Sequence, residues 1–402
     1  MPMNTMSFVQ AATVLNSIVS QATGKAQLTP TDTASFVALA KVGLETGYDP
    51  LATAISQVLT RTIFSVRPYT RKFGGLFADA NRWGNHVRKL QVVDKDFVED
   101  DRIKLTDGQA IDMYKVRKPE VLQTNFYGES VYSDYVTIYR DQLDCAFSSP
   151  DEFIRFIRMV MQNISDKIEK AHEEMARGAL ANFIGGKILG DSANVVHLLD
   201  LYDTETGLTS TAATIKQPAN FAPFAKWLFS WIKTTSSLMS ERSIKYHQNF
   251  TISGVAKPIM RHTPAQMQKL YLYAKELNDI DASVLSGVFQ DQYMQLMDHE
   301  MVNYWQAIDS PMAVKLTNAG YTSSAGAATA GTVDEDAVLG VLFDEEAVGY
   351  TMINEWSGST PFNVAGGYSN IWWHFTDRYW NDLTENGVVM LLDHAPSAGG
   401  GT

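Results

Sequence analysis

The chain has 402 residues, of which 45% are hydrophobic, so we expect a packed globular core and exclude a disordered chain. A net charge of −12 speaks against a DNA-reading domain, which is usually basic. A single cysteine, Cys145, excludes an intrachain disulfide and a thiolate metal cage, and no apolar run reaches the length of a membrane span.

Charge is distributed unevenly along the chain. Residues 277–402 hold 17 acidic and 2 basic residues, whereas residues 61–90 hold seven basic residues against Asp79. This polarity fits charge-complementary contacts between copies of the chain, and a solvated acidic surface explains its acidic half equally well. The basic stretch could contact nucleic acid or the acidic surface of a neighbouring copy, or it could face solvent.

Three helices are expected near the start of the chain. Ser7 and Gln10 form a capping box, and the apolar face that follows ends near Gly24. A second helix spans about residues 31–46, and Pro50 begins a third. The residues before Lys25 carry no charge, which fits a signal peptide poorly, so we expect a soluble protein that is not secreted.

Residues 90–145 predict a long, polar β-hairpin. From Asp94 to Glu120, 14 of 27 residues are charged, and Asp107-Gly108 supplies a turn signal. Residues 126–139 then alternate as a strand does. A hairpin with so many charged residues cannot fill a core. It therefore lies either in solvent or along another molecule.

A long helix is predicted to follow the hairpin. Ser149 caps it, Pro150 occupies its first position, and its apolar stripe continues to Gly185-Gly186. At 1.5 Å per residue, its length is roughly 50 Å. A coiled coil is the alternative, but the irregular stripe favours a helix that lies across a sheet as a structural spine.

Residues 200–347 carry mixed signals that suit an α+β domain. The stretch 319–332, rich in Ala, Gly, Ser and Thr, is typical of a flexible loop. The other expected elements are a helix from about Pro223, a strand at 250–255, a capped helix at 263–277, and strands at 338–343 and 347–353.

The segment 371–392 contains three of the eight tryptophans, Trp372, Trp373 and Trp380. Its β-branched and aromatic side chains occur on both faces and predict a strand buried from both sides. A final apolar run, Val388–Leu392, follows. The last strands therefore close a core that earlier residues build, which indicates one interleaved architecture.

Catalytic and metal motifs are incomplete. His172-Glu173 resembles the start of a zinc-protease motif, but Ala176 stands where the second ligand belongs, so we expect a solvated helix face. The triplet 298–300, if helical, cannot converge on one ion. Cys145 is interpreted as a small buried hydrophobe. We predict no catalytic, cofactor-binding or metal residues, no cofactor and no enzyme activity.

The order of these parts resembles the major capsid protein of tailed bacteriophages, with its Hong Kong 97-type fold, and is most similar to the head proteins of small podophages. The segments that carry the resemblance are Asn182–Gly186, Arg261–Pro264, Val341–Asp344 and, above all, Asn370–Val388.

The resemblance implies an α+β fold in which a spine helix lies on a sheet. It also implies that the Trp-rich strand packs under the spine and shares a sheet with the base of the hairpin. The implied parts are an N-terminal helical arm (1–89), an extended loop (90–145), a peripheral domain (146–205 and 350–393), an axial domain (206–349) and a flexible tail (394–402).

The implied function is structural. Copies would form hexamers and pentamers of an icosahedral or prolate shell around a double-stranded DNA genome, with the arm and the hairpin finding their partners mostly outside their own core. Implied partners are scaffold, portal and decoration proteins, and packaged DNA contacted non-specifically, with no membrane. The protein would belong to the virion and assemble in the host cytoplasm. An encapsulin-like compartment shell is one alternative, and an uncharacterised small-oligomer enzyme is another.

Some relatives carry an immunoglobulin-like domain after the last strand, which we do not expect in this chain. Others crosslink subunits through a lysine and an asparagine, a pair that this sequence does not identify.

Overall fold

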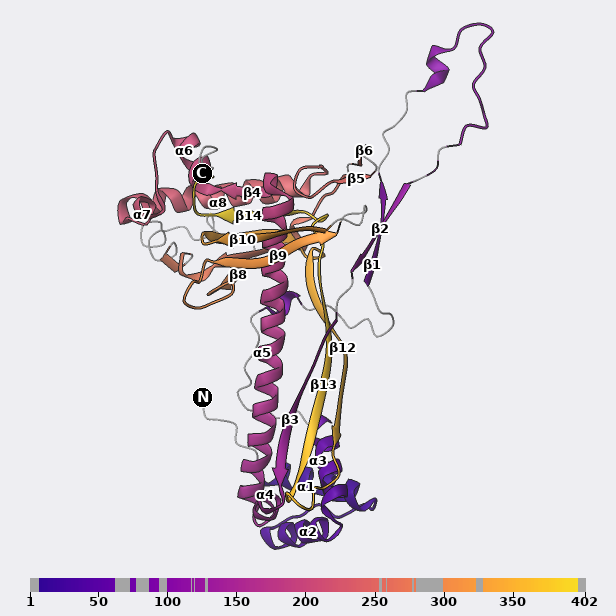
Figure 1. Cartoon of the computed structure of the whole chain (residues 1–402), viewed down its shortest axis with the longest axis vertical. Coiled ribbons are helices and arrows are strands. Elements are labelled where there is room, and N and C mark those ends of the chain that lie inside the picture. The colour runs from indigo at the N-terminus through magenta and orange to yellow at the C-terminus, as the bar shows by residue number, and fades with distance from the viewer. Residues whose placement is uncertain are drawn as a thin grey trace. The chain divides into compact units, whose positions relative to one another are not determined.

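A computed structural model of the chain shows two compact units (Figure 1). One combines residues 1–83, 128–176 and 350–379, and the second combines 84–127, 177–349 and 380–402. The predicted division into arm, extended loop, peripheral and axial domains stays a prediction. The structure describes residues 7–61, 73–76, 87–93, 100–116, 118, 120–126, 129–252, 255–257, 259–276, 278–279, 299–322 and 328–396.

The first unit begins with the three predicted helices, α1 (Phe8–Thr23), α2 (Thr33–Glu45) and α3 (Tyr48–Arg61). The Ser7 capping box is confirmed, and the chain leaves α1 at Gly24 in the left-handed conformation that glycine adopts readily, with φ of 68°. Local capping signals therefore set these boundaries.

The sheet of the first unit has three strands in the order β12-β13-β3. The Trp-rich strand is β13 (Tyr368–Asn381), between β12 (Val348–Ser359) and β3 (Glu129–Tyr139). β13 pairs antiparallel with β3 from Tyr368 opposite Tyr139 to Arg378 opposite Glu129. The predicted sheet between the Trp-rich strand and the base of the hairpin is confirmed.

One core joins α1–α3 to the long helix and to β13. Phe36 of α2 meets Phe153 of the long helix edge to face at 5.7 Å between ring centroids, and Trp373 belongs to the same core. The prediction that the helical arm finds its partners mostly outside its own core is therefore wrong for residues 8–58. Helices this short are marginal alone, so they bury their apolar stripes against the nearest large apolar face.

Burial of the Trp-rich strand differs from the prediction. Along β13 buried residues alternate with partly exposed ones, and Ile371, Trp373 and Phe375 face the core. Trp372 and His374 lie on the opposite face. The strand is therefore covered on one face only along this stretch. The aromatic side chains on its other face bury part of their surface by stacking on one another.

The long helix α5 (Pro150–Gly190) has 41 residues, so its length is about 60 Å. Ser149 caps it as predicted, accepting a hydrogen bond from the Glu152 amide at 3.3 Å. It does not end at Gly185-Gly186. A Cβ at Gly186 would lie 2.9 Å from Leu383 Cδ1, so the glycine permits close packing inside the helix rather than ending it.

The second unit is built on a five-stranded sheet in the order β4-β14-β11-β7-β8. All residues of β11 and β14 are buried. One face packs against α6 and α8, and on the opposite face Phe183 of α5 contacts Phe343 at 5.6 Å between ring centroids. The elements are β4 (Val195–His197), α6 (Leu198–Thr206), α8 (Pro218–Ser240), β7 (Gln268–Tyr273), β8 (His299–Val302), β11 (Val338–Asp344) and β14 (Gly387–Leu391).

Several predictions for this unit are wrong. The helix predicted at 263–277 is the sheet strand β7, because the Thr263 hydroxyl donates to Asp344 Oδ2 at 2.7 Å instead of capping a helix. The helix predicted from Pro223 begins at Pro218, which occupies its first position, where a missing amide costs nothing. The predicted loop 319–332 contributes to the hairpin of β9 (Val314–Thr322) and β10 (Ala328–Glu335), since backbone pairing does not need large side chains.

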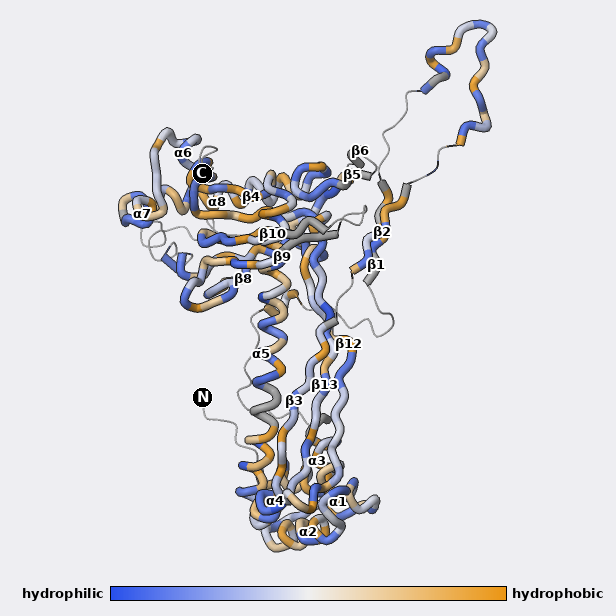
Figure 2. Tube along the Cα trace, in the orientation of Figure 1, coloured by the Kyte–Doolittle hydropathy of each residue, from blue (hydrophilic) through white to orange (hydrophobic). Residues whose placement is uncertain are grey.

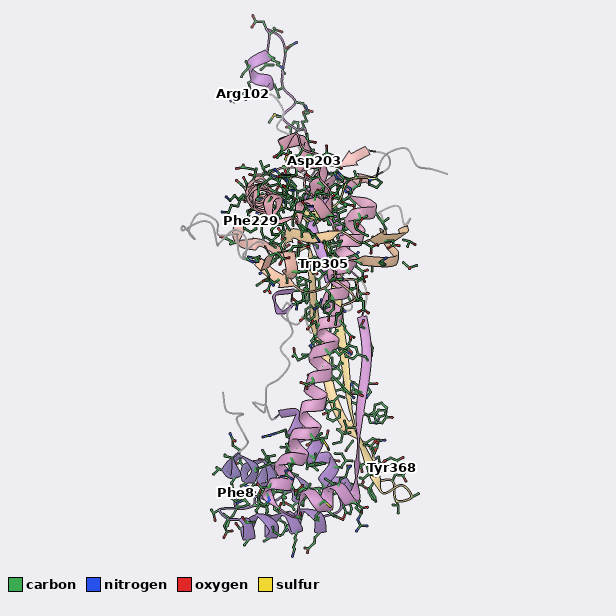
Figure 3. All side chains as sticks on the ribbon, turned by 90° about the vertical axis from the view of Figure 1, so that its left-hand side faces the viewer. Phe8, Arg102, Asp203, Phe229, Trp305 and Tyr368 are labelled. Atoms are coloured by element: carbon green, nitrogen blue, oxygen red, sulfur yellow. The ribbon has the colours of Figure 1, made fainter. Side chains whose placement is uncertain are left out.

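Trp305 shows how the polar tip of a core residue is satisfied. The ring is buried, and its indole Nε1–H donates to the Val338 carbonyl at 2.9 Å. Figure 3 shows Trp305 among the crowded side chains of the second unit. None of the helices in the described part of the chain is long and apolar enough to cross a membrane.

Further short elements are η1 (Gly74–Leu76), α4 (Arg140–Ala146), η3 (Ser192–Asn194), α7 (Ala212–Ile215), β5 (Phe250–Ile252), β6 (Val255–Lys257) and η4 (Ala265–Met267).

A polar hairpin is present in the second unit, but the strand predicted at 126–139 is not part of it, because β3 pairs with β13 in the first unit. β1 (Val87–Val93) pairs antiparallel with β2 (Glu120–Phe126) over seven residue pairs. Between them lie the short helix η2 (Asp101–Lys104) and the predicted turn, where Gly108 has φ of 88°. The segment 100–116 has no strand, so among the described residues of the hairpin only its root forms a ladder.

Candidate functional site

The structure places the residues of the incomplete sequence motifs in surroundings that differ from those predicted. His172 and Glu173 are buried rather than solvated, and His172 Nε2 lies 3.4 Å from Asp377 Oδ2. Cys145 is exposed, not buried. His299 and Glu300 lie on strand β8, while Asp298 is outside the described residues. Within the described ranges, no group of three or more acidic, histidine or cysteine side chains could hold a metal ion.

The first candidate surface is the segment 100–116, the described outer part of the extended loop predicted at 90–145; from here on, the extended loop means residues 100–116. Every residue from Arg102 to Val116 is exposed, and Figure 2 shows apolar stretches alternating with polar ones along it. Met113 and Tyr114 are 81% and 80% exposed. Large apolar side chains this exposed gain free energy when a partner covers them. The exposed apolar residues are Ile103, Leu105, Ile111, Met113, Tyr114 and Val116.

The second candidate surface is the outer face of the β12-β13-β3 sheet, opposite the core. Trp356 of β12 stacks on His374 at 3.9 Å between ring centroids, and Trp372 stacks on Tyr135 at 4.5 Å. Tyr139 meets Tyr368 edge to face at 5.9 Å. The rings follow one another across strands because residues paired in an antiparallel sheet point to the same face.

This aromatic face carries no Lys, Arg, Asp or Glu along most of its length. The outward residues of β3 and β13 between Val131 and Tyr139 and between Tyr368 and Thr376 are uncharged. Trp356 is nevertheless 53% exposed. Depletion of charge together with Tyr and Trp enrichment is typical of the centre of a protein interface. We define the aromatic face as Val131, Ser133, Tyr135, Thr137, Tyr139, Trp356, Tyr368, Asn370, Trp372, His374 and Thr376.

A third feature, the charged turn, comprises residues 382–386 between β13 and β14. All five of its side chains are buried, although four of them are polar or charged. Asn386 Nδ2 donates to Thr263 Oγ1 at 3.1 Å, and its Oδ1 lies 3.0 Å from His247 Nδ1. The turn is therefore part of the packed interior of the second unit.

Lys187 of α5 holds the main chain of this turn. Its side chain is fully buried, and its Nζ lies 2.7 Å from Asp191 Oδ2. The same nitrogen lies 3.5 Å and 3.4 Å from the carbonyl oxygens of Leu383 and Glu385. Burial lowers the pKa of Lys187, and the charge of Asp191 opposes that effect. A helix end and a turn almost 200 residues later in the chain are thereby fixed to each other.

Glu385 connects the turn to the hairpin root. Its carboxylate makes ion pairs with Lys89 of β1 and with Arg261. Arg261 Nη2 also donates to Thr384 Oγ1 at 3.1 Å. Burial raises the pKa of Glu385 to about 7, although the charges of Lys89 and Arg261 lower it.

Lys89 contacts two further carboxylates. Its Nζ lies 2.9 Å from Glu346 Oε2 and 3.3 Å from Asp382 Oδ2. Desolvation lowers the pKa of Lys89, but the surrounding carboxylates outweigh it and the net pKa is raised. The lysine therefore stays charged near neutral pH, at the base of the extended hairpin.

The sequence singled out residues 379–388 for their resemblance but not for these contacts. The available signal was a run of polar residues, Asp382, Thr384, Glu385 and Asn386, between two strongly apolar strands. Such a run ordinarily marks an exposed turn. Its burial depends on Lys187 and Lys89, which lie far away in the sequence.

Comparisons with known proteins agree with this architecture. A family model described as "Phi29-like phage major capsid protein" matches residues 15–391. A chain of "Capsid structure of Staphylococcus phage Andhra" is similar with 11% identity and a TM-score of 0.53, over 83% of this chain and 87% of that chain. A chain of "Structure of head fiber and inner core protein gp22 of native bacteriophage P68" has 12% identity and a TM-score of 0.55, over the same shares.

At these identities the two structures show a likeness of fold, which confirms the predicted α+β fold class. No curated protein sequence matches the chain significantly.

Proposed function

Because the chain belongs to the Phi29-like phage major capsid protein family, we propose that its extended loop and aromatic face are contacts between copies in the capsid shell. The protein is a structural component of the virion and not an enzyme. Family membership favours a phage capsid over the compartment-shell and enzyme alternatives.

The exposed apolar side chains of the extended loop carry the proposal. An isolated subunit exposes Ile103, Met113, Tyr114 and Val116 to water at once. In a shell every subunit is surrounded by copies of itself, so a neighbour can cover these side chains in every position. Their charged companions in the loop, including Arg102 and Lys104, keep the free subunit soluble.

The aromatic face supplies a complementary surface. A flat, uncharged face centred on Trp356, Trp372 and Tyr135 can receive an extended apolar segment without burying an unpaired charge. We propose that the extended loop of one copy lies on the aromatic face of the next. This pairing joins two different surfaces, and such head-to-tail contacts close into rings when the rotation permits. Rings of this kind would correspond to the predicted hexamers and pentamers.

Disulfide trapping between two single-cysteine proteins tests this pairing. Both carry Cys145→Ser, one also carries Met113→Cys and the other Trp356→Cys. After mild oxidation during assembly, the mixture should yield a covalent heterodimer, while neither protein alone yields comparable product. The control replaces Trp356→Cys with Leu28→Cys, a residue of the same unit that is 92% exposed. Equal trapping with the Leu28→Cys protein would overturn the pairing.

The remaining partners are part of the proposal at the level of the family. We propose contacts with scaffold, portal and decoration proteins, assembly in the host cytoplasm, and weak non-specific contact with packaged double-stranded DNA. The net charge of −12 supports weak rather than tight DNA contact. The arm, extended-loop, peripheral and axial roles predicted for the parts of the chain are proposed on the same basis. Affinity purification from infected cells would identify the protein partners.

A further inference from the structure

We propose that Glu385 is a positioning residue for assembly: through Lys89 it fixes the direction in which the extended hairpin leaves the second unit. The consequence for assembly rests on the proposed role of the extended loop. The positioning itself concerns a single subunit and can be measured there.

Backbone pairing does not account for the hairpin's direction. In the described part of the chain, β1 forms a sheet with β2 alone, and that sheet is separate from the five-stranded one. Lys89 lies opposite Thr124 within this ladder. Its Nζ reaches Glu385, Asp382 and Glu346, so ionic side-chain contacts link the hairpin to the body of the unit.

The turn that holds Glu385 is fixed by contacts with several neighbouring groups. Glu385 sits in a turn whose main-chain oxygens face Lys187 Nζ, and Asp382 N donates to the Ala347 carbonyl at 2.7 Å. On its other side the carboxylate is paired with Arg261. A charge held in this way offers Lys89 one position rather than a range, which is what orientation of a long hairpin requires.

The charged groups around Glu385 come from several elements. Lys89 of β1 and Arg261 attract its negative charge, and Asp382 of the same turn repels it. Lys187 of α5 approaches the turn from within, paired with Asp191, and Glu346 binds Lys89 on its exposed side. Burial outweighs these attractions and brings the pKa of Glu385 to about 7.

Protonation of Glu385 near neutral pH therefore removes the charge of one of the three carboxylates that hold Lys89. The hairpin should be loosened and not released, because Asp382 and Glu346 remain. Acidification from pH 8 to pH 6 should consequently broaden the range of hairpin directions and slow the joining of copies.

Electron spin resonance on unassembled full-length protein tests the positioning. Spin labels on Met113→Cys in the extended loop and Leu208→Cys in the same unit report the distribution of distances in a Cys145→Ser background. The distribution should be narrow at pH 8 and broader at pH 6. Glu385→Gln and Lys89→Met should be broad at both pH values, whereas Lys89→Arg, which keeps the charge, should be narrow at pH 8.

The matched control is Glu335→Gln. Burial also raises the pKa of Glu335, but its carboxylate accepts a hydrogen bond from the Ala337 amide and is not one of the three that hold Lys89, so its variant should behave as the parent does. A narrow distribution for Glu385→Gln at pH 8 would overturn the inference. This result is distinguishable from failure of the proposed loop contact, because disulfide trapping between copies and distance distributions within one subunit are independent measurements.

Discussion

Lys187 Nζ lies 2.7 Å from Asp191 Oδ2, one turn further along α5, and the lysine side chain is completely buried. The pair anchors the main-chain oxygens of the charged turn. Lys187→Met should destabilise the subunit by about 3–5 kcal/mol, because it leaves the Asp191 charge buried without its partner. Urea unfolding would measure this loss.

The control for that prediction is Lys170→Met, which removes an exposed lysine of the same helix that is paired with Glu174. Exposed pairs contribute little, so its unfolding midpoint should hardly move. Similar unfolding midpoints for the two variants would show that the buried Lys187–Asp191 pair contributes no more to stability than an exposed pair does.

The two adjacent tryptophans of β13 should differ in effect. Trp373→Ala removes a core ring and should cost roughly 3–5 kcal/mol, giving misfolded subunits. Trp372→Ala removes a partly exposed ring that stacks on Tyr135, so its subunits should fold normally but assemble poorly. Circular dichroism with sedimentation of assembly reactions separates the outcomes. Soluble, assembling Trp373→Ala protein would contradict the assignment of the faces.

Gly349 lies against the indole of Trp380. A Cβ at this position would lie 2.2 Å from Trp380 Cζ2, so Gly349→Ala should destabilise the subunit by about 1–3 kcal/mol through overpacking. Replacing Trp380 with Leu in the same protein should recover part of the loss. Thermal unfolding of both variants checks this, and a lack of any recovery would point to a backbone cause.

The stability of the subunit should depend on pH through Glu385. Its pKa in the fold, about 7, is above the ordinary value of 4.5, so the folded state favours the protonated form. The contribution of this group is therefore greatest below about pH 4.5 and falls as pH rises through 7. Relative to the parent, Glu385→Gln should gain stability at pH 8.5 compared with pH 5.5, by about 2 kcal/mol. The opposite sign in urea unfolding would refute it.

Local signals in the sequence located much of the fold. The capping box at Ser7 and the cap at Ser149 set helix starts that the structure confirms, because a cap needs only residues within one turn. The strand 338–343 was predictable from its continuous apolar run, and it is buried on both faces. These features depend on neighbours in the chain.

Features that depend on distant residues were mispredicted. The segment after Thr263 carries a helix-start signal, but the Thr263 hydroxyl donates to Asp344, and Gln268–Tyr273 joins the sheet as an inner strand. His172 and Glu173 were expected in solvent because their burial requires β12 and β13 to pack on α5. The charged turn was recognised as a resemblance, while its contacts with Lys187 and Lys89 required the structure.

The most direct test of the central claim is electron microscopy of the purified full-length protein beside a Met113→Ser, Tyr114→Ser, Val116→Ser variant. These exposed side chains contribute little to the folded subunit, so the variant should keep the parent's unfolding midpoint. We predict closed shells or capsomer rings for the parent and dispersed subunits for the variant. Small uniform oligomers of the parent under every assembly condition, or shells formed equally well by the variant, would contradict the account.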